Sequence, residues 1–245
     1  MEWSDEAIVL SSRPHGETGI VLELLTRDHG RHAGLVRGGT SRRARPALQP
    51  GNSVHVGWRA RLEEHLGSFT CELARARAGD LMDSRERLAG LNAFTAMTSA
   101  AMPERQSHAA VFLGGEVLLD AMTSQDALHW MTLYIRWELG LLEALGFGLD
   151  LSECAASGST SDLAYVSPKS GRAVSRDGAG IYAARLFALP AFLLDARADE
   201  PTPQEIRAGL ALTGNFLLER VLQPHGKQMP AARLRLDTLA DSQIP

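Results

Sequence analysis

The residues most suited to binding chemistry are the arginines in the stretch LVRGGTSRRARPALQPG, residues 35–51. Arg42, Arg43 and Arg45 follow a Gly-Gly-Thr-Ser turn and precede two prolines, with no acidic residue between them. A guanidinium presents several N–H donors in a planar fork that matches phosphate oxygens. Glycine lets such a loop approach a ligand closely, and proline restricts the conformations of its backbone. The stretch suits contact with a phosphate backbone, and a solvated surface loop is an equally open alternative on composition alone.

The charge around this loop differs from that of the whole chain. The 245 residues have a net charge of −4, whereas residues 11–62 hold nine arginines against three acidic residues, which makes that segment +6. Residues 1–80 sum to +1 and residues 81–245 to −5. A localised positive field on a mildly acidic protein can orient a polyanion, which uniform basicity does less well.

The composition is that of a globular protein, with 44% hydrophobic and 22% charged residues. The N-terminal sequence lacks the positive and apolar regions of a signal peptide, and no apolar stretch approaches the ~20 residues that span a bilayer. Cys71 and Cys154 stand far apart without CxxC spacing, so we expect buried thiols in a reducing compartment. We therefore expect a cytoplasmic protein without a membrane partner.

Short β-prone runs fill the first part of the chain and alternate with turn sequences. Five strands in roughly 75 residues suit a small barrel, for which the OB-fold is the common solution. An SH3-like barrel or a sandwich fragment is the open alternative. The runs are Ala7–Leu10, Ile20–Leu25, Ala33–Val36, Val54–Trp58 and Leu66–Leu73. We expect residues 1–80 to form an OB-fold domain that binds nucleic acid.

Helical spacing begins near Met82, where apolar residues recur at steps of three or four. The residues from Asp126 to Leu145 predict the strongest helix, apolar all round and therefore buried on most sides. A second helix is expected over 203–222, with Thr202 and Glu205 in a capping box, and helical spacing that is interrupted at Pro190 also marks 182–194. The fold class is thus α+β, with a helical domain over 81–245 that contains a β-hairpin insertion at about 152–178.

Catalytic and cofactor motifs are absent from the sequence. It contains no phosphate-binding P-loop, nucleophile elbow or HExxH zinc motif. Residues 178–183 fit GxGxxA, but a polar turn precedes them where a dinucleotide site needs a buried strand. His29 and His32 lack further ligands that would complete a zinc site. These absences favour a binding protein over an enzyme.

Five segments in order along the chain resemble RecO, a bacterial recombination-mediator family. Each segment alone is short, and together they cover nearly the whole chain. The N-terminal matches are RPHGETGIV (13–21), LTRDHGR (25–31) and GLVRGG (34–39). The C-terminal matches are YVSPKSGRAV (165–174) and FLLERVL to GKQMPAAR (216–233).

The resemblance implies an OB-fold followed by a helical domain and a non-enzymatic role in RecF-pathway repair. Such proteins bind single- and double-stranded DNA, anneal complementary strands, contact the acidic C-terminal tail of single-stranded DNA-binding protein, and with RecR help to load RecA. The resemblance also implies that the protein is associated with the nucleoid. We expect an acidic tail to dock near Arg185. The predicted phosphate contacts are Arg27, Arg31, Arg37, Arg42, Arg43 and Arg45, extended by Lys227 and Arg233.

The chain departs from the family pattern in one respect. Some RecO proteins carry a four-cysteine zinc site after the central helices, where this chain has only Cys154. We therefore expect a zinc-less hairpin insertion, no bound metal and no cofactor.

Two other functions are compatible with the residues. One is a structural or adaptor protein whose barrel binds a protein partner, with an incidental arginine loop. The other is a hydrolase or transferase with an unrecognised site in the helical half, which a perturbed carboxylate in a deep pocket would support.

Overall fold

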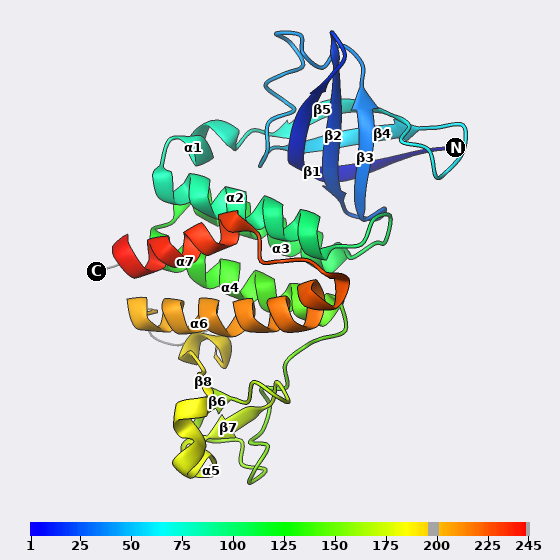
Figure 1. Ribbon diagram of the computed structural model, residues 1–245. Coiled ribbons are helices and arrows are strands. Elements are labelled where there is room, and N and C mark those ends of the chain that lie inside the picture. Colours follow the sequence, from blue (N-terminus) through cyan, green and yellow to red (C-terminus); the bar gives the residue numbers. More distant parts are fainter. Residues whose placement is uncertain (196–200, 244–245) are drawn as a thin grey trace. The chain divides into compact units, whose positions relative to one another are not determined.

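A computed structural model of the chain describes residues 1–195 and 201–243. The chain divides into two compact units, Met1–Ser124 and Gln125–Pro245. Figure 1 shows a β-barrel followed by helices in the first unit, and further helices with a small sheet in the second.

The first unit begins with a closed five-stranded barrel of strand order β1-β2-β3-β5-β4. All neighbouring strands are antiparallel except β3 and β5, which run parallel. The predicted OB-fold is confirmed. The strands are β1 (Glu2–His15), β2 (Gly19–Thr26), β3 (Arg31–Val36), β4 (Ser53–Arg59) and β5 (Ser68–Arg75).

Alternation along the strands fills the barrel interior. In β2, Ile20, Leu22 and Leu24 are buried while the residues between them are partly exposed, as expected for side chains that point to opposite faces of a strand. A register shift between Val9 and Ser11 interrupts the pairing of β1 with β2. The interior is completed by Ala7, Val9, Val36, Leu48, Val54, Val56, Trp58 and Phe69.

Three helices complete the first unit: α1 (Ala78–Met82), α2 (Arg85–Ala101) and α3 (Ala109–Ser124). The Arg77 side chain is 2% exposed and joins α3 to the barrel, with Glu116 at 2.7 Å and Asp120 at 2.6 Å. The first compact unit therefore extends to Ser124. The predicted boundary after residue 80 lies where strands give way to helices, and as a domain boundary it stays a prediction.

The second unit contains α4 (Ala127–Ala144), α6 (Pro203–Phe216) and α7 (Ala231–Gln243). Asp126 caps α4 by accepting a hydrogen bond from the His129 N–H at 3.1 Å. Nine residues of α4 are buried, which confirms the helix expected to be enclosed on most sides. The predicted capping box of Thr202 and Glu205 is present at the start of α6. This helix continues into a π-helical turn at Leu217–Leu222 and a 3₁₀ turn at Gln223–His225.

A three-stranded sheet lies between α4 and α6 in the sequence. It consists of β6 (Leu163–Val166), β7 (Ala173–Ser175) and β8 (Phe187–Ala188), and β6 with β7 forms the predicted hairpin. Helical turns at Arg176–Ala179 (α5), Gly180–Arg185 and Ala191–Leu193 accompany it.

The helical spacing read over 182–194 was misleading, because those residues do not form one helix. Phe187 and Ala188 pair with β6, and the Leu189 N–H donates to the Ala164 carbonyl at 2.9 Å. Pro190 has no N–H to continue a helix. No helix in the described ranges is long and apolar enough to cross a membrane.

Candidate nucleic-acid interface

The arginine loop, residues 37–51, connects β3 to β4. The Thr40 N–H donates to the Thr18 carbonyl at 3.3 Å, and the Asn52 amide donates to the Pro46 carbonyl at 2.8 Å. Leu48 is buried in the barrel interior. Gly38 has a φ of +66°, in the left-handed region that favours glycine. Local turn chemistry and contacts with the barrel thus hold the loop's backbone in place.

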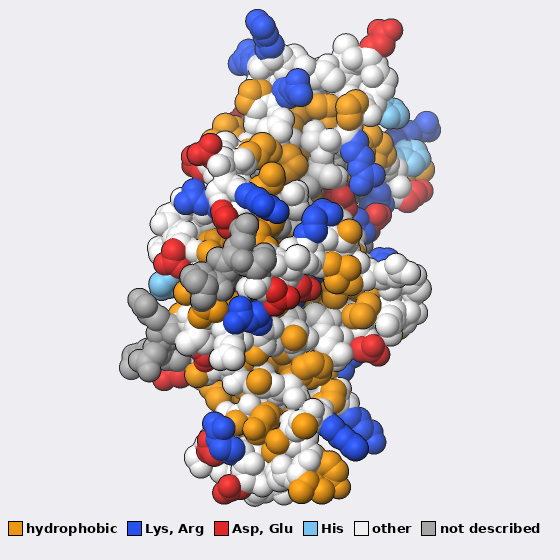
Figure 2. Space-filling view, turned by 60° about the vertical axis from the view of Figure 1, so that its left-hand side comes forward, with side chains coloured by type: hydrophobic (Ala, Val, Ile, Leu, Met, Phe, Trp, Pro, Cys, Tyr) orange, Lys and Arg blue, Asp and Glu red, His pale blue; other side chains and the backbone are white. Residues whose placement is uncertain are grey.

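The arginines of this loop point into solvent. Arg37, Arg42, Arg43 and Arg45 are all exposed, and none forms an ion pair with an acidic side chain within residues 1–195 and 201–243. Figure 2 shows Lys and Arg side chains projecting from the tip of the barrel. Four hydrated guanidiniums without an acidic partner in the described part of the chain can bind phosphate oxygens.

A pocket of about 410 Å³ lies beside the loop, between it and the first two strands. Arg45 and Thr40 line one side, and Ser12 and Ile20 line the other, together with Pro14, Gln49 and Pro50. Arg13 is exposed on the neighbouring part of β1 and has no acidic partner in the described chain.

Arg13 is a further candidate at this surface that was not among the predicted phosphate contacts. It lies on β1, in the hairpin that pairs Arg13 with Val21. The excess of arginine in residues 11–62 is the sequence signal that could have indicated it.

Arg27 and Arg31 lie at the opposite end of β3 from the arginine loop. The six residues of β3 span roughly 20 Å. Arg27 approaches Glu6 at 3.4 Å and lines an acidic pocket that also includes Asp5, Asp28 and Glu72. This negative surrounding opposes a phosphate contact.

Arg31 is engaged within the first unit. Its side chain is 15% exposed and forms an ion pair with Glu23 at 2.6 Å, while its Nε donates to the Met102 carbonyl at 2.9 Å. The structure therefore separates Arg31 from the loop and gives its guanidinium internal partners.

Arg233, which was expected among the phosphate contacts, has a fully buried side chain, which opposes that role. The guanidinium donates from Nε to Glu138 Oε1 at 2.6 Å and from Nη2 to Glu138 Oε2 at 2.9 Å. It also bonds the Leu210 carbonyl and the Asp237 carboxylate. A neighbouring carboxylate stabilises the charged guanidinium, and this residue holds α7 against α4 and α6. In the sequence Arg233 lies between Ala232 and Leu234, and its carboxylate partner Glu138 is 95 residues away.

The other two predicted residues are exposed but lie in the second unit. Lys227 is in the segment before α7. Arg185 ends a 3₁₀ turn that also carries Ile181, which is 90% exposed, and Tyr182, which is 59% exposed. A cation beside two exposed apolar side chains is the combination expected at the docking site of an acidic, partly apolar tail.

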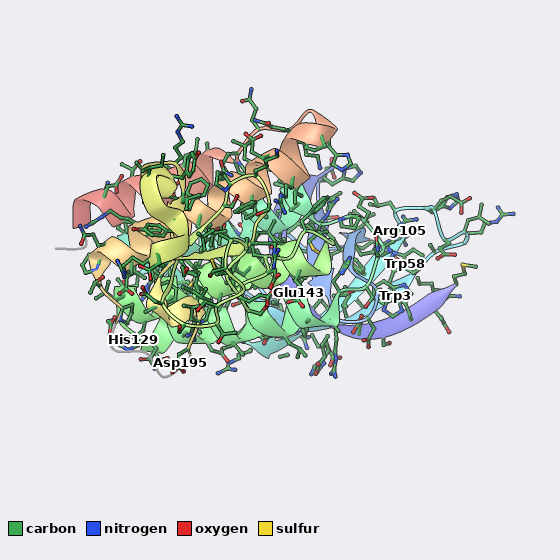
Figure 3. The ribbon with its side chains drawn as sticks, turned by 90° about the horizontal axis from the view of Figure 1, so that it is seen from below. Trp3, Trp58, Arg105, His129, Glu143 and Asp195 are labelled. Atoms are coloured by element: carbon green, nitrogen blue, oxygen red, sulfur yellow. The ribbon has the colours of Figure 1, made fainter. Side chains whose placement is uncertain are left out.

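The aromatic residues of the barrel pack against one another. The ring centroids of Trp3 and Trp58 are 5.6 Å apart, and Trp3 also stacks on His29 at 4.1 Å. Figure 3 labels both tryptophans within the barrel. Burial lowers the pKa of His32, whose ring meets Trp58 edge-on. Because Trp58, His32 and Phe69 are all buried, they do not offer faces for base stacking.

Arg105, on the connection between α2 and α3, fixes the loop between β4 and β5. Its guanidinium donates to the Glu63 carbonyl at 2.5 Å and to the His65 carbonyl at 3.1 Å. The Trp58 indole N–H donates to the Leu66 carbonyl in the same loop at 3.1 Å. The shape of this loop is thus set by hydrogen bonds from two other segments of the first unit.

The hairpin region contains no cluster suited to a metal. Across the described residues, no group of three or more His, Cys, Asp or Glu side chains could hold a metal ion. Cys154 is buried, and hydrogen bonds from Ser157 and Ser175 lower the pKa of its thiol to about 6. Its Sγ accepts from the Ser175 N–H at 3.2 Å. The expected absence of zinc stays a prediction.

Comparisons with known proteins cover both halves of the chain. The family model "Recombination protein O N terminal" matches residues 1–77, and "Recombination protein O C terminal" matches residues 82–229. The chain is 51% identical over 238 residues to DNA repair protein RecO of Rhodospirillum rubrum, which covers 96% of this chain and 94% of that protein. It is also 51% identical over 237 residues to the RecO proteins of Rhodospirillum centenum and Methylobacterium nodulans, covering 96% and 95% of this chain and 93% and 95% of theirs.

Proposed function

This chain belongs to the RecO family of DNA repair proteins, and on that premise we propose that it is a non-enzymatic, DNA-binding recombination mediator. It binds single- and double-stranded DNA and anneals complementary strands. With RecR it helps to load RecA onto DNA covered by single-stranded DNA-binding protein, in RecF-pathway repair at the nucleoid. An adaptor protein whose barrel binds a protein partner is the alternative.

The arginine loop is the observation that carries this proposal. Arg37, Arg42, Arg43 and Arg45 project from one end of a barrel without acidic partners in the described residues. Each guanidinium that neutralises a phosphate releases a condensed counterion, so such a surface gains affinity for any DNA strand. Contacts of this kind position a strand without reading its sequence.

The buried aromatic cluster supports the same mode of binding. Barrels that hold bases by stacking expose aromatic faces, whereas Trp58 and Phe69 are 2% and 3% exposed here. We infer that the loop binds the phosphate backbone and leaves most bases free. Free bases suit a protein that brings complementary strands together.

The acidic tail of single-stranded DNA-binding protein is proposed to dock near Arg185. Arg185 supplies a cation, and the exposed side chains of Ile181 and Tyr182 supply apolar contacts on the same turn. A fluorescent peptide with this tail's sequence should bind the wild type and lose affinity for Arg185→Ala. Equal affinity for the two proteins would place the tail elsewhere.

The test of DNA binding is a salt series with a labelled single-stranded oligonucleotide. For single strands, log K falls with log[salt] at about −0.7 per phosphate contact. Joint change of Arg42, Arg43 and Arg45 to Ala should therefore make the slope shallower by roughly two units. A matched control changes three exposed arginines outside the barrel, Arg85, Arg176 and Arg235, and should leave the slope unchanged.

Two results would contradict the proposal. An unchanged slope in the folded triple variant would move the DNA site away from the arginine loop. Absence of DNA binding by the wild type, together with partner binding that depends little on salt, would favour the adaptor function.

A further inference from the structure

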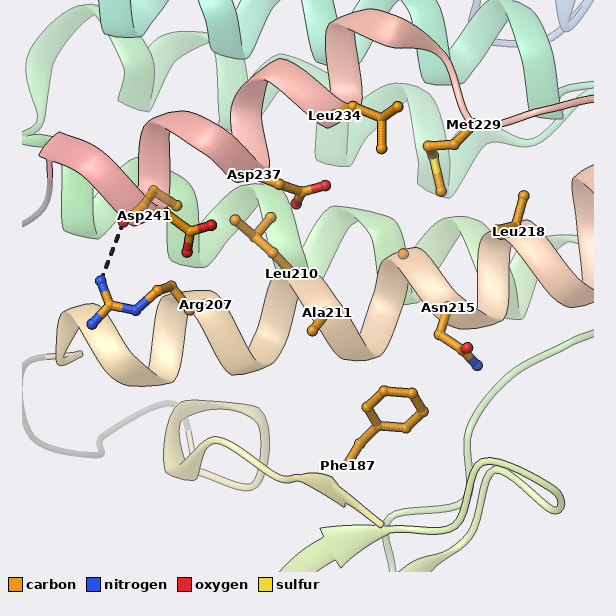
Figure 4. Close-up of a pocket in the computed structure, with 12 residues that line it drawn as sticks. Phe187, Arg207, Leu210, Ala211, Asn215, Leu218, Met229, Leu234, Asp237 and Asp241 are labelled. Carbon is orange, nitrogen blue, oxygen red and sulfur yellow. Dashed lines mark hydrogen bonds between the residues drawn. The ribbon is translucent and has the colours of Figure 1, made fainter. Parts of the chain in front are cut away.

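An open groove of about 410 Å³ lies along the α6–α7 surface of the second unit. Figure 4 shows α7 on one side of α6 and Phe187 on the other. Its apolar lining comes from Phe187, Leu210, Ala211, Leu218, Met229 and Leu234. Leu234 is 52% exposed although it lies among these apolar neighbours.

The floor of the groove is a stripe along α6 and the π-helical turn that continues it. Arg207, Ala211 and Leu218 are spaced so that they follow one face of the helix, and Gly214 and Asn215 complete the lining there. The eleven steps from Arg207 to Leu218 rise about 16 Å, the length of three helical turns. Because Ala211 is exposed and Gly214 has no side chain, the backbone of a second helix could approach α6 closely.

One end of the groove carries more negative than positive charge. Arg207 donates to the Ala240 carbonyl at 3.3 Å, one of the last carbonyls of α7. Asp237 and Asp241 line the groove beside it, and in Figure 4 their carboxylates point toward α6. Asp237 is bonded to Arg233, whose other carboxylate partner is Glu138. Among the described residues that line this end, two carboxylates therefore stand against one guanidinium, near the negative end of the α7 dipole.

The excess negative charge also affects proton binding at this end. Burial raises the pKa of Asp237, the Arg233 guanidinium opposes that rise, and the Asp241 carboxylate adds to it. A cation placed between Asp237 and Asp241 would relieve this repulsion. The acidic tail discussed above has the wrong charge for this end of the groove.

We propose that the α6–α7 groove docks an amphipathic helix of a protein partner, with apolar side chains along the stripe and an arginine or lysine beside Asp241. This inference does not rest on DNA binding by the barrel. The apolar lining supplies contact area, the small residues of α6 permit close approach, and the acidic end selects the orientation and the charge of the helix.

The test uses two labelled synthetic peptides, each about four helical turns long, with leucines on one face. They differ only in having two arginines or two glutamates beside that face at one end. The arginines should attract the carboxylates at the acidic end, whereas the glutamates should be repelled by them. The arginine peptide should therefore bind roughly tenfold tighter than the glutamate peptide. Asp241→Asn should reduce this preference.

Two protein variants distinguish the groove from nonspecific binding. Ala211→Arg places a long side chain in the groove from an exposed helical position and should abolish binding of the arginine peptide. Ala231→Arg makes the same change at an exposed alanine that does not line the groove, and should leave binding intact. Circular dichroism of both variants establishes that they are folded.

The proposal is overturned if the wild type binds neither peptide saturably, if it binds both equally, or if Ala211→Arg leaves binding unchanged. It is also overturned if the wild type is a dimer that Ala211→Arg dissociates, because the occupant is then a second copy of the chain. A wild type that binds the arginine peptide but does not bind DNA would refute the proposed function and leave the groove proposal standing.

Discussion

Arg233 and Glu138 form an ion pair in which neither side chain is exposed, and its disruption is a sharp test of how the second unit is held together. The change is Arg233→Met, which keeps an apolar stem of similar length and removes the charge. Glu138 is then left buried without its guanidinium partner, and it still accepts a hydrogen bond from the Thr213 hydroxyl.

The expected loss follows from the burial of both partners. Removal of one member of a buried ion pair costs about 3–5 kcal/mol, because the other charge remains desolvated and uncompensated. Small proteins unfold in urea with a slope of about 1–3 kcal/mol per molar. The urea midpoint of the second unit should therefore fall by roughly 2 M.

Replacement of both partners separates the cost of an orphaned charge from the worth of the pair. In the double variant Glu138→Leu with Arg233→Met, no charge of the pair remains buried, and much of the lost stability should return. Far-ultraviolet circular dichroism follows the helices, and the fluorescence of Trp130 and Trp137 follows α4. The DNA affinity of the single variant, measured below its unfolding transition, should equal that of the wild type.

Two outcomes would refute this reasoning. One is a loss below about 1 kcal/mol in Arg233→Met, the range of an exposed ion pair. The other is a folded Arg233→Met variant with weakened DNA binding, which would return Arg233 to the phosphate-contacting residues.

Four further predictions concern two turn glycines, the two capping residues of α6 and a buried histidine. Gly16 and Gly30 both have φ above +60°, but only at Gly30 would a Cβ meet a backbone atom, the Gln106 carbonyl oxygen at 2.0 Å. Gly16→Ala should lower the free energy of unfolding by about 1–2 kcal/mol, and Gly30→Ala should lower it clearly more. Equal losses would show that the close approach is unimportant. Thr202→Ala should cost about 1 kcal/mol through loss of the α6 cap. Burial raises the pKa of Glu205, but N–H donors from Thr202 and Ala191 outweigh it and keep this pKa below its ordinary value. The ionised Glu205 therefore stabilises the fold at neutral pH, and this contribution is lost as the pH falls through the folded-state pKa. Glu205→Gln should flatten that acid dependence in urea titrations, and an unchanged profile would contradict it. Burial lowers the pKa of His32 from 6.5, so the unfolded chain takes up its proton first and barrel stability should decline as the pH falls below that value; His32→Phe should remove this decline, measured by tryptophan fluorescence, and its persistence would assign the titration to another group.

The sequence by itself determined the features that depend on local spacing. Short β-prone runs separated by turn sequences predicted the barrel strands. Two other features also depend only on residues that are close together in the sequence. They are the capping box of Thr202 and Glu205 and the enclosed helix after Asp126. The arginine loop needed only its own composition, and the family followed from segments read in order.

Only the tertiary structure decided which charged residues face solvent and which are taken up by partners. Arg43 and Arg233 look alike in sequence, yet one is exposed and the other is fully buried against Glu138, 95 residues away. The strand at Phe187 likewise depends on pairing with β6 and not on its own periodicity. The fate of a guanidinium is set by the electrostatic and hydrogen-bonding partners that distant segments bring to it, because a long polar side chain carries no local signal of its burial.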